Sequence, residues 1–336
     1  LVILPFLRIG GMQLFHLEGD DPYDKFLPKI STVISKIVII YIVLTLILFV
    51  LYYITGMTLF DSIAHSFSTI STGGFSTHNA SFAYFDNIYI LLIAIVFMII
   101  GSFPFLVLAQ TSIKKPFATI KDQQVKIFLL ILFISISLIY FFAQHLLDGS
   151  EVKKIIVISF NTISIISGTG FVSENFENWG NYASVLFLIL MFIGGCAGST
   201  TGGLKVFRFQ ILFKFISLHL NRMLKPHAVI AKHFNGKKIH DSTYESVMSF
   251  FFIYILTFSV SALLLSFSGL DFLTCFSASA SAISNVGPGL GEIIGPEGNF
   301  SPLNNYSKVV LIFTMFLGRL EMLTILILFI PSFWKN

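Results

Sequence analysis

The chain has 336 residues, a net charge of only +4, and a composition that is 55% hydrophobic, 15% aromatic and 11% charged. Because soluble domains carry about 25% charged residues, these values exclude an ordinary soluble domain and indicate a protein with several membrane spans. The small net charge points to no particular partner. The two cysteines both lie in or beside apolar segments, so they predict no disulfide framework.

The first residues, LVILP, are apolar and include no starting Met. No charged region or cleavage site precedes them, so the sequence predicts no signal peptide. We expect a further membrane segment before residue 1.

Six long apolar runs predict membrane helices, since a helix needs about 20 such residues to cross the hydrocarbon layer. They cover residues 37–54, 88–108, 127–143, 183–193, 247–267 and 309–330. The fourth run stops early at GGCAGSTTGG and resumes at Leu204, which predicts an interrupted span. Pro104, within the second run, predicts a kink.

Three weaker segments lie between paired spans, at residues 60–70, 155–166 and 271–283. Each is too short to cross the membrane as a helix, which favours a re-entrant element. Each ends in I-S-x-x-G, and the final glycines are Gly74, Gly170 and Gly287. The order of span, short helix, glycine-bearing loop and span therefore occurs three times, which predicts an all-α polytopic membrane protein of repeated units.

These repeats divide the chain into residues 1–30, a connecting segment, and three pore units at residues 31–113, 114–238 and 239–336. Lys and Arg gather in the connections, whereas acidic residues follow the glycines. The connections should therefore face the cytoplasm and the glycine-bearing loops the outside. The basic stretch at residues 207–238 could bind anionic lipid or an acidic partner, or it could be ordinary flanking charge.

The I-S-x-x-G loops place irregular backbone at membrane depth, where it is tolerated only if protein buries it or it lines a wet cavity. A dehydrated cation can replace the missing donors of such carbonyl groups, and glycine permits the angles that point successive carbonyls into a pore. No carboxylate or histidine recurs in the three loops, so carbonyl coordination is favoured over side-chain coordination. The alternative is three tight turns that cap buried half-helices.

Four motifs carry a family resemblance: FSTISTGGFSTHNAS from Phe67, GGCAGSTTGGLK from Gly194, NVGPGLG from Asn285 and FLGRLE from Phe316. With them the chain resembles the TrkH family of the Trk/Ktr/HKT potassium transporter superfamily over nearly its whole length. The resemblance implies four membrane–pore–membrane repeats around one pseudo-fourfold ion pore. The three visible units would be the second to fourth repeats, and LVILPFLRIGGMQLF resembles the end of the first.

The same resemblance implies a non-enzymatic protein that takes up potassium across the bacterial cytoplasmic (inner) membrane. K+ would be the transported ion, with no cofactor. The family also implies a homodimer in the lipid bilayer, with one pore in each subunit, and a cytosolic nucleotide-binding ring of the TrkA or KtrA kind as a partner. No nucleic-acid partner is expected.

By resemblance, the potassium filter lies in the three I-S-x-x-G loops. Its residues would be Ser71, Thr72, Gly73, Gly74, Phe75, Ser167, Gly168, Thr169, Gly170, Phe171, Ser284, Asn285, Val286, Gly287 and Pro288. In relatives, a serine in place of the first repeat's glycine accompanies sodium transport. That position lies outside this sequence, so the preference for potassium is implied by three of the four loops.

The interruption at residues 194–203 cannot stay helical, because each of its five glycines costs roughly 1 kcal/mol relative to alanine. In the resembling family such a break forms an intramembrane loop below the filter that obstructs ion passage. The candidate gate residues are Gly194, Gly195, Gly198, Ser199, Thr200, Thr201, Gly202 and Gly203. The alternative is a helix kink that serves packing alone.

Arg319 lies inside the last apolar run, where a charged residue costs at least about 2.5 kcal/mol and marks a functional site by default. Glu321, two residues further on, lies on a different helix face and is a poor partner. We expect Arg319 to face the pore, where carbonyls of the interrupted span accept its protons and its charge repels a cation. The alternative is a structural ion pair with a carboxylate elsewhere.

Two other classes of function compete with this interpretation. A solute carrier, or a sodium- or proton-coupled cation symporter, would use broken helices to form a closed midplane site, but carriers have inverted or paired repeats, whereas these run in one direction. A membrane enzyme is disfavoured because the sequence contains no H-E-x-x-H, Walker or G-x-S-x-G motif. His65 and His78 are expected to be hydrogen-bonded structural residues.

Overall fold

The computed structural model describes residues 27–110, 118–225, 233–234, 237–238, 241–320, 322, 325 and 330–335. Within these residues the architecture is helical apart from one short antiparallel hairpin. Its strands are β1 (His233–Phe234) and β2 (Lys237–Lys238), with His233 opposite Lys238. The expected all-α class is confirmed.

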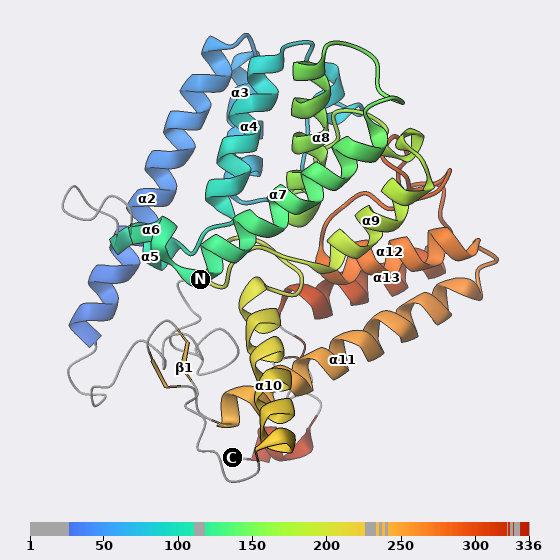
Figure 1. Cartoon of the computed structure of the whole chain (residues 1–336). Coiled ribbons are helices and arrows are strands. Elements are labelled where there is room, and N and C mark those ends of the chain that lie inside the picture. Colours follow the sequence, from blue (N-terminus) through green and yellow to red (C-terminus); the bar gives the residue numbers. More distant parts are fainter. Residues whose placement is uncertain are drawn as a thin grey trace.

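The helices form three successive units, which Figure 1 shows in blue to cyan, green to yellow, and orange to red. The first unit consists of α2 (Leu27–Ile54), α3 (Leu59–Ile70), α4 (Ile88–Gly101) and α5 (Phe105–Gln110). The short α6 (Ala118–Lys121) leads to the second unit, α7 (Gln123–Ala143), α8 (Glu151–Ile166), α9 (Asn181–Phe192) and α10 (Val206–Leu224). The third unit is α11 (Asp241–Ser266), α12 (Phe272–Ser284) and α13 (Asn305–Arg319). Three 3-10 turns complete the described helices: η2 (Ser81–Tyr84), η3 (Phe176–Trp179) and η4 (Pro331–Lys335).

Each unit opens with a helix that is long and apolar enough to cross a membrane, namely Ile34–Ile54, Gln123–Ala143 and Thr243–Ser266. The returning spans of the first two units are broken. One break separates α4 from α5 at Pro104, so the expected kink is a full interruption, and the other separates α9 from α10 at the expected glycines. The last predicted span continues past Arg319 into residues that lie partly outside the described ones.

The three predicted half-helices are α3, α8 and α12, and each begins at a polar cap. The side chains of Thr58, Ser150 and Asp271 accept hydrogen bonds from the backbone N–H groups of the first turns. Such caps satisfy donors that a helix start leaves free. Ser150 also explains why α8 begins at Glu151, four residues before the apolar pattern predicts it.

The spans bury their apolar side chains incompletely, whereas the half-helices bury polar ones. Outward residues of α2 such as Ile39 and Leu46 are exposed, while Ser62, Asn161 and Ser279 of the half-helices are fully buried. An apolar exterior around a polar interior is the arrangement that a lipid environment favours. The half-helices therefore turn their polar faces toward the interior of the molecule.

Candidate functional site

The three I-S-x-x-G loops, at residues 71–75, 167–171 and 284–288, share one unusual backbone pattern. In each loop the second and fourth residues have positive φ, and the residue between them does not. The pairs are Thr72 (50°) and Gly74 (70°), Gly168 (64°) and Gly170 (79°), and Asn285 (55°) and Gly287 (116°). Alternation between the two hands turns successive carbonyl groups toward one side and N–H groups toward the other.

The N–H groups of these loops point back into the half-helices. Gly73 donates to Ser68 O at 2.7 Å, Thr169 to Ser164 O at 2.9 Å, and Val286 to Ser281 O at 2.9 Å. The carbonyl oxygens of Gly73, Thr169 and Val286 accept no hydrogen bond from any described residue. Each loop therefore offers free acceptors on the side that faces away from its helix.

The loops pack against one another in chain order. A Cβ atom added to Gly74 would overlap the Thr169 carbonyl oxygen, and one added to Gly170 would overlap that of Val286. The glycine of each of the first two loops thus lies against a free carbonyl of the next loop. On Gly287, by contrast, an added Cβ would meet only Gly170 Cα, at 3.8 Å. Among the described residues the arrangement is an arc that is open beyond its third loop.

The phenylalanines that follow the first two glycines have opposite environments. Phe171 is fully buried against Phe82 and His65 of the first unit. Phe75 occupies the equivalent position one unit earlier, yet 81% of its surface is exposed. Side chains of the first unit therefore pack around Phe171, but no described residues pack around Phe75 in the same way. This difference again indicates an open arc.

All three half-helices direct their C-terminal ends at these loops. A helix C-terminus carries a partial negative charge equivalent to roughly half an electron charge. Three such ends, together with free carbonyl oxygens, create a negative potential without any carboxylate in the loops. The electrostatics of the site favour a cation.

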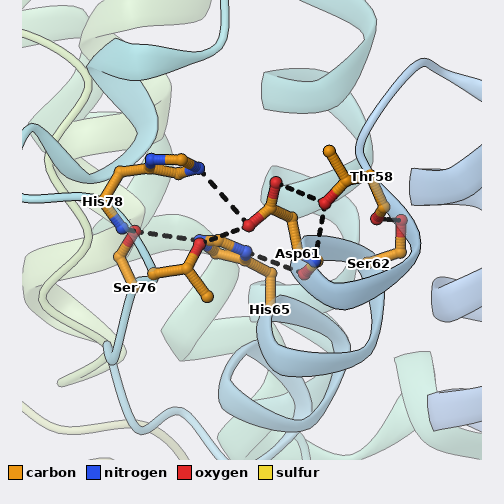
Figure 2. A network of polar contacts seen from close by, with 7 residues as sticks. Thr58, Asp61, Ser62, His65, Ser76 and His78 are labelled. Carbon is orange, nitrogen blue, oxygen red and sulfur yellow. Dashed lines mark hydrogen bonds and ion pairs between the residues drawn. The ribbon is translucent and has the colours of Figure 1, made fainter.

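A polar network fastens the backbone that leaves the first loop (Figure 2). His65 bonds through Nδ1 to Asp61 O at 2.8 Å and through Nε2 to Ser76 Oγ at 2.9 Å. Thr77 donates to Asp61 Oδ1 at 2.6 Å, and His78 Nε2 lies 3.3 Å from the same oxygen. The expectation of hydrogen-bonded structural histidines agrees with these contacts for His65, whereas the His78 ring lies at ion-pair distance from Asp61 and makes no hydrogen bond to a described residue. Among the described residues no group of three or more His, Cys, Asp or Glu side chains could hold a metal ion.

The Gly-rich segment, residues 194–203, lies across the ends of all three half-helices. Thr200 Oγ1 donates to Ile70 O at 3.1 Å. A Cβ added to Gly202 would overlap Ser284 O, and one added to Gly168 would lie 3.6 Å from Gly202 N. Backbone bonds close the base of the segment, from Gly194 N to Leu204 O at 2.9 Å and from Leu204 N to Phe192 O at 3.1 Å. The segment is thus a compact loop directly below the carbonyl arc.

Arg319 reaches this loop from the third unit. Gly318 lets α13 pass the end of α12 closely, because a Cβ there would overlap Ile283 O. The next residue then directs its guanidinium at the Gly-rich segment, and Nη2 donates to Thr200 O at 3.2 Å. The expected contact between Arg319 and a carbonyl of the interrupted span is present. Glu321 lies outside the described residues.

The comparisons with known proteins agree with this geometry. Residues 1–336 match the family model TrkH, described as a cation transport protein. The chain belongs to the TrkH family. It is 38% identical to the Trk system potassium uptake protein TrkI of Halomonas elongata and 39% identical to TrkH of Vibrio parahaemolyticus, with all of this chain aligned in both cases. It covers 68% and 70% of those two proteins.

A solved structure shows the same fold. The crystal structure of the potassium transporter TrkH from Vibrio parahaemolyticus matches with a TM-score of 0.86 at 36% identity, over 96% of this chain and 69% of that one. Membership of the TrkH family makes this chain a multi-pass membrane protein for ion transport, and not an enzyme.

Two sets of residues near the arc were not recognised in the sequence of this TrkH-family chain. The first is Ser68, Ser164 and Ser281, whose carbonyls hold the loops; they extend the repeated motif to S-x-I-S-x-x-G, so a longer self-comparison would have found them. The second is Tyr52 and Tyr254, whose hydroxyls contact Thr69 Oγ1 at 3.1 Å and Ser284 Oγ at 2.6 Å. No sequence pattern distinguishes these tyrosines from others in the spans.

Proposed function

We propose that this protein takes up potassium across the bacterial cytoplasmic (inner) membrane through a filter of backbone carbonyls. The observation that carries the proposal is the alternation of φ in three equivalent loops, which leaves carbonyl oxygens free and facing one another's glycines. The relatives named above are potassium uptake proteins. Carbonyl rings replace the hydration shell of a potassium ion without adding charge to the filter.

The filter consists of the fifteen residues of the three I-S-x-x-G loops, and a fourth loop completes it. The open arc beyond Gly287, the exposed Phe75, and the coverage of 68–70% of the relatives' length support a further membrane–pore–membrane unit. Residues 31–113, 114–238 and 239–336 then correspond to three of four pore repeats around one pseudo-fourfold axis. This fourth loop would belong to the first repeat of the family. The residue that it places beside the three loop glycines, either glycine or serine, adjusts discrimination against sodium.

The Gly-rich segment and Arg319 act as the gate. The segment lies where an ion leaves the carbonyl arc, and its glycines permit it to move. Arg319 adds a positive charge beside the same place, bound to Thr200 O. The segment blocks the ion sterically, and the guanidinium opposes it electrostatically.

The broken spans are the one observation that favours a coupled symporter, because discontinuous helices are common at the binding sites of carriers. The three units nevertheless follow the same order and place equivalent loops side by side, as a pore requires. Symport with sodium or protons is therefore the second candidate. A dependence of potassium uptake on an imposed sodium or proton gradient, at a fixed membrane potential, distinguishes it from a channel-like pore.

Two assembly features belong to this proposal. We expect a homodimer with one pore in each subunit, since twofold dimers are the commonest oligomers. A nucleotide-binding ring of the TrkA or KtrA kind docks on the basic cytoplasmic side, and no cofactor binds. The mass of the detergent-solubilised intact protein should equal two copies, whereas a tetramer would contradict the arrangement.

The decisive functional experiment is ion flux into liposomes that contain the intact protein. Potassium and rubidium should enter, and sodium should enter much more slowly. Equal rates for the three ions would contradict a carbonyl filter, and no flux of any of them under an inward gradient would contradict transport.

A further inference from the structure

The two broken spans of this protein interlock through their backbones. α4 ends at Gly101 and α5 begins at Phe105, and the Gly-rich segment lies against this break. Cys196 donates its N–H to Ser102 O at 3.0 Å, and Thr200 donates to Gly101 O at 3.3 Å. In the other direction, Phe105 donates its N–H to Gly198 O at 3.0 Å.

Pro104 explains why these backbone groups of the first unit are free to bond the Gly-rich segment. Proline has no N–H, and its ring clashes with the carbonyl four residues back, so it interrupts a helix. In an unbroken helix the N–H of Phe105 would bond Gly101 O, and Ser102 O would accept from Leu106. Instead all three freed groups bond the Gly-rich segment. Helical bonding resumes beyond the break, where Leu108 donates to Pro104 O at 3.0 Å.

These groups are buried, which makes their pairing obligatory. Ser102 and Cys196 are fully buried, and Phe105 is almost so. An unpaired backbone group without water is costly, so the segment cannot leave the break unless water or new partners replace it. The break between α4 and α5 thus supplies the hydrogen-bond partners of the Gly-rich segment, in addition to bending the span.

Side chains strengthen the contact at two points. Thr200 Oγ1 donates to Gly101 O at 3.1 Å, in addition to its backbone bond. Gln124, a buried residue at the start of α7, accepts the N–H of Ala197 through Oε1 at 3.0 Å. Three amides in five residues of the segment are therefore held from the first unit and from α7, whereas Arg319 holds only the Thr200 carbonyl.

We propose that the 101–105 break is a latch that holds the Gly-rich segment in place below the carbonyl arc, with Pro104 and Gln124 as positioning residues. The inference rests on the proposed gating function. The latch binds the N–H and hydroxyl groups of Thr200, whereas Arg319 binds its carbonyl oxygen, so the two restraints use different groups of this residue. Neither positioning residue contacts the ion path, and filter selectivity does not depend on them.

Two substitutions in the intact protein test the latch. Pro104→Ala restores an N–H that lets α4 and α5 join, which withdraws the Gly101 and Ser102 carbonyls. Gln124→Met removes the acceptor for Ala197 at similar volume. Loss of one ordinary hydrogen bond shifts the balance between held and released segment by about fivefold.

The controls are Pro302→Ala, in an exposed loop, and Gln123→Met, which keeps the backbone carbonyl that Gln210 Nε2 contacts at 3.1 Å. Two quantities are measured: hydrogen–deuterium exchange of a peptide spanning residues 194–204, and potassium flux into liposomes with its ratio to sodium flux.

The latch predicts faster exchange of this peptide in both test variants, and the latch together with the proposed gate predicts higher potassium flux with an unchanged ion ratio. The controls should match the wild type in both measurements. Unchanged exchange in folded Gln124→Met and Pro104→Ala protein overturns the latch. If Pro104→Ala does not fold, Gln124→Met alone decides. Faster exchange without higher flux supports the latch and contradicts the gating role of the segment instead.

Discussion

Arg319 and Thr200 meet below the ends of the half-helices, where the guanidinium Nη2 donates to the threonine carbonyl oxygen at 3.2 Å. The hydroxyl of the same threonine donates to Ile70 O and Gly101 O, both at 3.1 Å. One residue of the Gly-rich segment therefore connects the first and third units. In the proposed pore, a cation that leaves the carbonyl arc would meet this junction and an adjacent positive charge.

Replacement of Arg319 by alanine should raise potassium flux. Two unit charges about 4 Å apart repel by about 4 kcal/mol at an effective dielectric of 20, which sets an upper limit of roughly three orders of magnitude in rate. Water in the cavity reduces the effect, so we expect a rise of at least about tenfold. Potassium uptake into liposomes measures it. Arg222→Ala, at the exposed end of α10, is the matched control, and a flat or lower flux in well-folded Arg319→Ala contradicts the electrostatic role.

A deletion within residues 198–202 should also raise potassium flux, because it removes the steric part of the proposed gate. The potassium-to-sodium ratio should not change, since the carbonyl arc is left intact. If either the Gly-rich segment or the Arg319 charge alone limits the rate, the double variant should have a potassium flux only slightly above that of the faster single variant. Additive increases would mean that the two obstacles act in sequence, and reduced flux in a folded deletion would make the segment structural.

Serine at each of the loop glycines should weaken discrimination against sodium. Gly74→Ser and Gly170→Ser force a side chain into a neighbouring carbonyl. Gly287→Ser places a side chain on a backbone with φ of 116°, beside the proposed fourth loop. Gly269→Ser is the control, because its φ of 73° is similar to that of Gly170 but its added Cβ has no atom within 4 Å. Unchanged potassium-to-sodium flux ratios in all three loop variants would contradict the assignment of these loops to the filter.

Ser164→Ala should lower ion selectivity, although the Ser164 side chain does not contact the proposed ion path. Its hydroxyl donates to Phe171 O at 2.7 Å and so fixes the backbone that leaves the second loop. Loss of this buried bond costs about 1 kcal/mol of stability and loosens the loop. The sodium leak of the variant is compared with that of Ser184→Ala, on α9. An equal sodium leak in the two variants argues against a role in ion selectivity for Ser164, the first serine of the S-x-I-S-x-x-G motif.

The sequence predicted the elements of this fold well, because hydrophobic run length and repeated glycines are local properties. The half-helices lie where I-S-x-x-G placed them, and the interruption at 194–203 lies below the loops. The motif did not reveal that Phe75 and Phe171 differ, since their burial depends on which unit stands beside each of them.

Contacts between distant residues account for what the sequence did not reveal. Pro104 predicted a kink, but the partner of the break lies about 90 residues further along the chain and shares no pattern with it. The contact between Tyr254 and Ser284 likewise depends on how α11 crosses α12. The contact of Arg319 with a carbonyl of the Gly-rich segment was predicted because a charged residue in an apolar span is conspicuous.

The most direct measurement is anomalous diffraction from crystals of the intact protein grown with rubidium in place of potassium. The account predicts an anomalous peak in contact with the carbonyl oxygens of Gly73, Thr169 and Val286, on the side away from the half-helices. Gly170→Ser crystals should lose or displace it. A peak bound by side-chain hydroxyls instead, or no peak at the three carbonyls in protein that still transports rubidium, would contradict the carbonyl filter.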